Sequence, residues 1–232
     1  MANKNRGHAT SSNKGFSLIE LLVVMVVIGV MTAIAVPQMI SQRRLLRSQA
    51  VIREMATQMR YARQLAMSQQ QAMTFQYDNI TKETKIFDHN NNLLDFKSGT
   101  AVLVSNGGQL NTGSPATVVS TVPLAQGGLV PSEIKYGIPA GLPTDPLADG
   151  ISMTALYQNK FTVTFQADGS VIDPAGVPAG GIPVSQGIPI DRAMFIYNEK
   201  AAQTTAAAIS VLGASGRIKV WRYNINATKY QE

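Results

Sequence analysis

A single acidic residue in an otherwise apolar stretch has the clearest chemical consequence in this 232-residue chain. Residues 16–36 read FSLIELLVVMVVIGVMTAIAV, and Glu20 is their one ionisable side chain. A helix of this length covers about 30 Å, which is the thickness of the hydrocarbon core of a bilayer. A carboxylate at the bilayer centre costs of order 2.5–3.5 kcal/mol, so its presence indicates a functional requirement for Glu20.

Two interpretations of the apolar stretch compete. In the first, residues 1–35 form a secretory signal peptide with a basic start and with Ala33-Ile34-Ala35 as the cleavage site. In the second, the stretch is retained and crosses the membrane once. Glu20 favours the second interpretation, because a discarded peptide gives no reason to carry the cost of a carboxylate in an apolar segment.

The residues around Glu20 resemble the class III signal of type IV pilins and type II secretion pseudopilins. The matching stretch is Lys14-Gly15-Phe16-Ser17-Leu18-Ile19-Glu20-Leu21-Leu22, with a basic leader before it and the apolar run after it. The resemblance implies that a prepilin peptidase cuts between Gly15 and Phe16 and methylates the new amino terminus of Phe16. It makes Glu20 the fifth residue of the mature chain. It also matches Pro37 to the proline that ends the transmembrane half of pilin helices.

The position of Glu20 is consistent with a role in assembly. Four residues on a helix are about 6 Å, so Glu20 lies one turn from the amine that cleavage would expose at Phe16. Inside a filament of apolar helices, the Glu20 carboxylate and the ammonium group of a neighbouring subunit's amino terminus are each costly alone and compensate each other as a pair. We therefore expect Glu20 to set the axial register of an incoming subunit, as a polar residue does in a coiled coil.

Beyond Pro37 the apolar residues recur at spacings of 3, 4 and 7, which is typical of one face of a helix. These residues are Leu45, Ile52, Met55, Met59, Ala62 and Ala66. We expect one helix from Phe16 to about Gln70, with a kink or local melting at Pro37, because proline has no amide hydrogen and clashes with the preceding turn.

The second half of this helix is rich in arginine. Six arginines stand against Glu54 alone, and they are Arg43, Arg44, Arg47, Arg53, Arg60 and Arg63. They fit a solvated helix face of good helix formers. They also fit attraction of the first three arginines to phospholipid headgroups, or attraction to acidic neighbours in a filament.

After Gln70 the apolar period changes to 2, which predicts strands. Residues 72–77 and 84–87 flank a polar turn and are predicted to form a hairpin. Further strands are predicted over 101–104, 116–122, 160–165, 193–197, 206–212 and 217–223. The sequence therefore predicts an α+β fold in which a long helix packs on an antiparallel sheet. Two tracts rich in proline and glycine, 127–150 and 173–189, are predicted to be surface loops or edge connections.

The order of these elements is similar to that of the H-type minor pseudopilins and related minor pilins (the GspH/FimT class). The motifs behind this similarity are the turn Phe165-Gln166-Ala167-Asp168-Gly169 and the closing pair Gly216-Arg217. The resemblance implies a pilin-like fold with a leader at 1–15, a transmembrane half-helix at 16–36, an amphipathic half-helix at 37–70 and a β-rich domain at 71–232.

The same resemblance implies a place in the cell and a set of partners. The protein would be a single-pass protein of the bacterial inner membrane, with its carboxy-terminal domain periplasmic or extracellular. Its partners would be the prepilin peptidase, other pilins or pseudopilins, and the assembly platform of a secretion or pilus machine.

Few residues in this chain could support catalysis or bind a metal. There is no cysteine, and the only histidines are His8 and His89, so a thiolate zinc site and a cysteine nucleophile are excluded. The glycine pairs lack the lysine and the serine or threonine that complete a phosphate-binding loop. We expect a structural subunit, not an enzyme, with no metal and no cofactor.

One predicted strand carries a second hypothesis. Alternation along residues 217–223 places Arg217, Lys219, Trp221 and Tyr223 on one face. Two cations and two aromatic rings suit phosphate contact and base stacking on nucleic acid, and some related minor pilins serve in DNA uptake. Against this, the chain is only weakly basic outside its leader. The formal net charge is +6, but without the three basic leader residues there are 17 basic and 14 acidic residues, a net charge of +3. A DNA-binding minor pilin and an ordinary strand face with Trp221 over the core edge both stay open.

Overall fold

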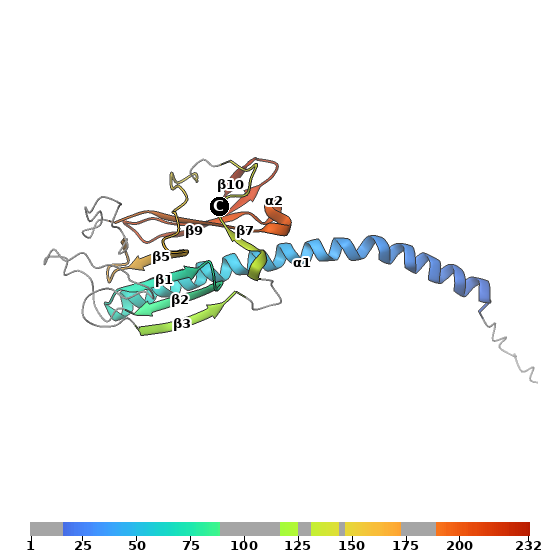
Figure 1. Cartoon of the computed structure of the whole chain (residues 1–232), viewed down its shortest axis with the longest axis horizontal. Coiled ribbons are helices and arrows are strands. Elements are labelled where there is room, and N and C mark those ends of the chain that lie inside the picture. The colour runs from blue at the N-terminus through green and yellow to red at the C-terminus, as the bar shows by residue number, and fades with distance from the viewer. Residues whose placement is uncertain (1–15, 89–116, 125–130, 144–146, 173–188) are drawn as a thin grey trace, which may run out of the picture. The chain divides into compact units, whose positions relative to one another are not determined.

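The computed structural model describes residues 16–88, 117–124, 131–143, 147–172 and 189–232 (Figure 1). Contacts within the chain divide it into two units, residues 1–42 and residues 43–232. One helix, α1 (Leu18–Gln69), contributes to both units, and every other described element belongs to the second.

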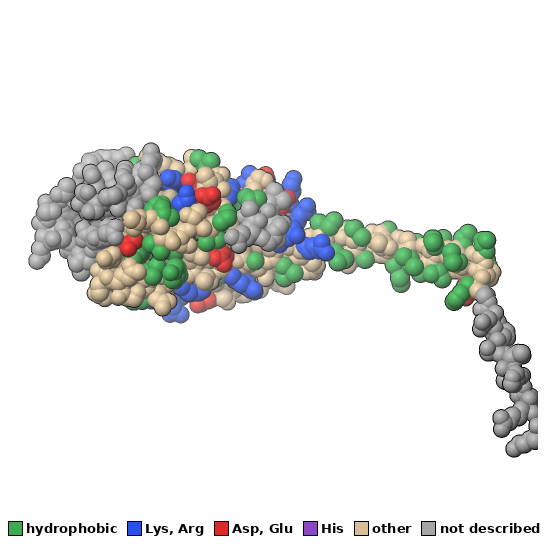
Figure 2. All heavy atoms as spheres, turned by 90° about the horizontal axis from the view of Figure 1, so that it is seen from below, with side chains coloured by type: hydrophobic (Ala, Val, Ile, Leu, Met, Phe, Trp, Pro, Cys, Tyr) green, Lys and Arg blue, Asp and Glu red, His purple; other side chains and the backbone are tan. Residues whose placement is uncertain are grey.

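In the first unit, α1 begins at Leu18, where the Leu21 amide donates to the Ser17 carbonyl over 3.2 Å. All residues from Phe16 to Ile40 are exposed, and Figure 2 shows hydrophobic side chains along this part of the helix. An 18-residue window of α1 has a mean hydropathy of 2.7, and none of the window is buried inside the protein. The Thr32 hydroxyl donates to the Ile28 carbonyl and so needs no water partner. By length and composition, this helix is able to cross a membrane.

Pro37 lies inside α1, and the helix continues on both sides of it. The local melting expected at this position is therefore not observed. The kink stays a prediction, since the missing amide hydrogen leaves one helical carbonyl without its usual donor.

The second unit contains two antiparallel five-stranded sheets. The first has the order β3-β2-β1-β5-β6, formed by β1 (Met73–Asp78), β2 (Glu83–Asp88), β3 (Thr117–Pro123), β5 (Lys160–Phe165) and β6 (Val171–Ile172). The second has the order β10-β9-β8-β7-β4, formed by β4 (Ile134–Tyr136), β7 (Arg192–Asn198), β8 (Ala207–Val211), β9 (Ile218–Asn224) and β10 (Lys229–Gln231). Two 3-10 turns, Pro131–Glu133 and Glu199–Ala201, and the short helix α2 (Ala202–Thr205) complete the described elements.

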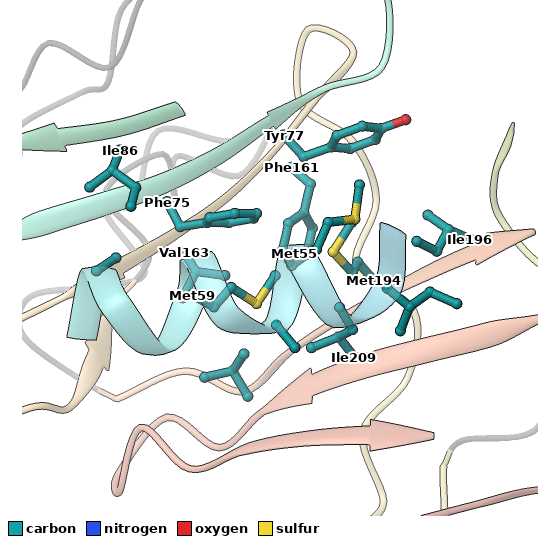
Figure 3. Packing of buried hydrophobic residues seen from close by; sticks show 14 of the residues in the cluster. Met55, Met59, Phe75, Tyr77, Ile86, Phe161, Val163, Met194, Ile196 and Ile209 are labelled. Atoms are coloured by element: carbon teal, nitrogen blue, oxygen red, sulfur yellow. The ribbon is translucent and has the colours of Figure 1, made fainter. Parts of the chain in front are cut away.

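The carboxy-terminal half of α1 shares one hydrophobic core with both sheets. Met55 and Met59 are fully buried, and Figure 3 shows them among Phe75 of β1, Val163 of β5 and Ile209 of β8. The apolar helix face predicted from the sequence is confirmed: Ile52, Met55, Met59, Ala62 and Ala66 are buried, and Leu45 is half-buried. Because both sheets contact the same helix face, α1 is the element that holds the second unit together.

The second sheet is buried on its other face as well. There, Phe195 of β7 and Trp221 of β9 pack with Leu142, Leu147 and Ile151, which lie between β4 and β5 in the chain. Burial on both faces explains why β7 and β8 consist largely of consecutive apolar residues rather than alternating apolar and polar ones.

Most of the predicted strands are confirmed, and one predicted loop is partly wrong. The predicted hairpin is β1 and β2, and the strands predicted over 116–122, 160–165, 193–197, 206–212 and 217–223 correspond to β3, β5, β7, β8 and β9. The strand predicted over 101–104 lies outside the described residues. The tract 127–150 is not only a loop, because it contains β4 and the buried Leu142 and Leu147. β4 is nevertheless an edge strand, as the prolines predict.

Arg63 of α1 connects the two sheets at one point. Its Nε donates to the Gly169 carbonyl over 3.4 Å, and its Nη2 donates to the Ser215 carbonyl over 2.9 Å. Gly169 lies in the turn between β5 and β6, while Ser215 and Gly216 lie in the turn between β8 and β9. One side chain on the helix therefore binds a turn from each sheet. We call Arg63, Gly169, Ser215 and Gly216 the Arg63 clasp.

The clasp needs glycine for two independent reasons. Gly169 and Gly216 have φ angles of 82° and 59°, which L side chains rarely adopt. A Cβ on Gly216 would also lie 2.0 Å from the Gly169 carbonyl oxygen and 2.7 Å from the Arg63 Nε. The close approach of the two turns thus depends on the missing side chain.

We expect Gly216→Ala to lower the free energy of unfolding by about 3 kcal/mol or more, through left-handed strain and overpacking together. Gly141→Ala is the matched control: Gly141 has φ +84°, but a Cβ there meets no atom within 4 Å, so strain alone should cost about 1 kcal/mol. Urea unfolding of the full chain in detergent, followed by the fluorescence of its single tryptophan, Trp221, measures both. Equal midpoints for the two variants would contradict the close approach at the clasp.

Candidate functional site

The amino-terminal segment of α1 carries the first candidate site. Phe16 precedes the helix and is 84% exposed, and Glu20 is the acidic residue of its first turn. The predicted cleavage partner Gly15 lies outside the described residues. The apolar neighbours of Glu20 on the first turns, Leu18 and Leu21, are 83% and 57% exposed. This segment therefore has an apolar surface that no described residue of its own unit covers, with one carboxylate on it.

The carboxylate of Glu20 has no polar side-chain partner among the residues that the structure describes. Within the described ranges, no residue forms an ion pair or a side-chain hydrogen bond with Glu20. Ser17 and Glu20 have the spacing of a capping box, a signal that the sequence interpretation missed. The free amides of the first helical turn also favour a negative charge at this position. The carboxylate is thus favoured locally by the helix start and remains available to a cation from outside the chain.

The second candidate site is the face of β9 proposed to contact nucleic acid. The predicted alternation is confirmed for Lys219, Trp221 and Tyr223, which all lie on the face of β9 that borders the second core. The Lys219 Nζ is 5.1 Å from the centroid of the Trp221 ring. The structure therefore brings the cation and the aromatic rings together.

Trp221, however, is part of the protein core. Its side chain is 4% exposed, and its Nε1 donates to the Ser210 Oγ over 2.8 Å. The Ser210 Oγ in turn donates to the Asp149 Oδ2 over 2.6 Å. This chain of hydrogen bonds fastens the segment around Asp149 to the sheet and leaves no open indole face on which a base could stack.

The charges and the tyrosine of this face also have partners. The side chain of Glu232 lies 3.9 Å from the Arg217 Nη2 and 3.6 Å from the Lys219 Nζ. Tyr223 and Tyr230 pack edge to face, with their ring centroids 5.5 Å apart. Burial, with a smaller contribution from Tyr223, raises the pKa of Tyr230 to about 12. This geometry favours the interpretation of an ordinary strand face with Trp221 over the core edge, and nucleic-acid contact by this face stays an untested prediction.

In the described part of the chain, no group of three or more His, Cys, Asp or Glu side chains is arranged to hold a metal ion. His89 lies outside the described residues. The chemistry that the described residues offer is therefore that of the apolar segment with Glu20.

Comparisons with known proteins find a family match at the amino terminus of the chain. Residues 10–36 match the family described as the prokaryotic N-terminal methylation motif. No curated protein matches the chain in sequence. Two crystal structures of the type IV minor pilin FimU of Pseudomonas aeruginosa (strain PAO1), in space groups P21 and P65, show distant similarity. Identities are 16% and 17%, TM-scores are 0.40 and 0.39, and the matches cover 79% of this chain and 92% and 97% of those chains. The family match covers the amino-terminal segment alone, so these comparisons identify a prokaryotic N-terminal methylation motif at residues 10–36 that leads into the exposed apolar half of α1.

Proposed function

We propose that the chain is a structural subunit of a type IV pilus or of a type II secretion pseudopilus. It is made as a precursor, anchored in the bacterial inner membrane by the first half of α1, and drawn into the filament after processing. The observation that carries the proposal is the match of residues 10–36 to the methylation motif. Residues 16–36 of this match are exposed and apolar, and Glu20 is their one charged residue.

The processing step is peptide hydrolysis. A prepilin peptidase cleaves the bond between Gly15 and Phe16, which leaves a carboxylate on the leader and an ammonium group on Phe16. Methylation of this nitrogen keeps its positive charge. Because α1 begins at Leu18, the new ammonium group lies just ahead of the first helical turn and one turn from Glu20.

Charge pairing, rather than apolar burial, would direct the transfer from membrane to filament. Lipid chains are as apolar as leucine, so moving the exposed residues of α1 from lipid to a bundle of other helices yields little hydrophobic free energy. The Glu20 carboxylate and the partner subunit's Phe16 ammonium group are costly when alone in either apolar environment. Pairing the two groups removes the cost of the unpaired charges. Because the groups meet at only one axial position of the incoming subunit along the filament, the pair would set the register of that subunit.

The first test is the amino terminus of the mature protein. Mass spectrometry of the membrane-extracted chain, produced in cells that contain a prepilin peptidase, should find residue 16 as an N-methylated phenylalanine. Gly15→Leu should keep the leader attached, because it replaces the glycine after which the peptidase of the resembled family cuts. A mature chain that begins at Val36 would show signal-peptide cleavage after Ala35 instead, and would contradict the proposal.

The second test is assembly. Glu20→Ala should leave cleavage and membrane insertion intact and should reduce incorporation into sheared filaments by about tenfold or more, because it leaves a neighbouring ammonium group unpaired. Glu54→Ala is the matched control, since Glu54 is an exposed carboxylate on the same helix whose contact is a hydrogen bond from the Gln58 Nε2 over 2.8 Å. Immunoblots of filament and membrane fractions measure the ratio. Equal incorporation of both variants would show that Glu20 does not set the register.

A further inference from the structure

Three arginines follow the apolar half of α1 in close succession. Arg43, Arg44 and Arg47 are the first charged residues after Glu20. At about 100° per residue, Arg47 lies about 40° around the helix from Arg43, and Arg44 lies about 100° from it, so all three share one side. Arg43 is exposed, while Arg44 and Arg47 are half-buried. Three positive charges are thus gathered on one side of α1, within five residues of the chain.

These arginines have no acidic partner within the described part of the chain. Other cations there do, for example Lys135, whose Nζ is 3.4 Å from the Glu199 carboxylate, and Lys219, which pairs with Glu232. The next acid along α1, Glu54, lies seven residues beyond Arg47, and its Oε1 accepts from Gln58. Among the described residues, the charge of Arg43, Arg44 and Arg47 therefore has no acidic counter-ion.

The position of these arginines along the helix matches the depth of lipid headgroups. This step rests on the proposed function, namely that the first half of α1 spans the membrane. Residues 16–40 correspond to about 37 Å of helix, somewhat more than the hydrocarbon core. Arg43 and Arg47 then follow Ile40 by about 4 and 10 Å. Long arginine side chains at this depth extend readily into the headgroup layer.

Membrane topology does not explain the three arginines. The proposed orientation places them on the non-cytoplasmic side, whereas basic residues next to a membrane span are favoured on the cytoplasmic side. Three arginines at this position therefore work against the orientation that the leader favours. A compensating interaction on the non-cytoplasmic side would account for their presence.

We propose that Arg43, Arg44 and Arg47 form a binding surface for anionic phospholipid headgroups, in the leaflet where α1 leaves the membrane. A guanidinium group binds a phosphate with two parallel hydrogen bonds and is more weakly hydrated than an ammonium group, so it suits this contact. The surface holds the subunit at a fixed depth before assembly, and the headgroups must be released when the subunit enters the filament.

The test measures lipid selectivity of the full-length chain in bilayers. The chain is reconstituted in phosphatidylcholine with either spin-labelled phosphatidylglycerol or spin-labelled phosphatidylcholine, and electron paramagnetic resonance gives the fraction of motionally restricted label. The wild-type chain should prefer phosphatidylglycerol, by at most about fivefold for each arginine at the surface. The preference should fall at 1 M salt, where the screening length is about 3 Å.

The variants locate the surface. Arg43→Gln with Arg47→Gln should remove most of the preference. Arg53→Gln with Arg60→Gln is the matched control, since it removes the same charge from exposed positions farther along the same helix and should keep the preference. All chains carry the same leader, so its basic residues contribute equally to every measurement.

Three results would overturn the proposal, each in a distinguishable way. Equal restriction of both lipids by the inserted wild-type chain would show that no anionic surface exists. Unchanged selectivity together with reduced filament incorporation of the Arg43/Arg47 variant would assign these arginines to an acidic neighbouring subunit. Absence of restricted lipid of either kind would show that α1 does not span the bilayer, and would overturn the proposed function as well.

Discussion

One helix has to satisfy two different environments, and this constraint shapes the rest of the molecule. The first half of α1 is apolar around its circumference and exposed, while the second half presents one buried stripe that includes Met55 and Met59. An all-round apolar surface suits lipid or a helical bundle, and a stripe suits a globular core. The change between the two patterns occurs where Arg43 and Arg44 interrupt the apolar sequence.

The second half of α1 organises two sheets that do not share a strand. Their apolar faces meet the helix through residues such as Phe75 and Ile209, and Arg63 fastens one turn of each sheet to it by hydrogen bonds. Because Gly216 lies too close to the Gly169 carbonyl to tolerate a Cβ, the two turns are in direct contact. The relation between the sheets is thus defined by the helix stripe along its length and by the Arg63 clasp at one point.

Sequence periodicity predicted the elements that are long and regular. The spacing of Ile52, Met55 and Met59 predicts the buried helix face, and alternation predicts β1, β2, β5 and β9, whereas β7 and β8 stand out as short apolar runs. It missed β4, β6 and β10, because two or three residues are too few to show a period, and their pairing depends on partners far along the chain. Likewise, the sequence predicts Arg63 only as one of six arginines on a charged helix face. Its contacts to Gly169 and Ser215 depend on turns about 106 and 152 residues away, which no local pattern reveals.

The two charged features of α1 would act in opposite directions during assembly. In the proposed membrane-bound state, Glu20 would lack a cation and the three arginines would contact headgroups, so Glu20 would favour entry into the filament and the arginines would favour retention in the membrane. In the proposed filament, Glu20 would gain the partner subunit's amino terminus while the arginines would lose the lipid. Since the apolar residues between them gain little from the transfer, the balance of these ionic contacts would determine when a subunit leaves the bilayer. On this proposal, a chain with such opposed contacts would stay in the membrane until a neighbour with a free amino terminus is present.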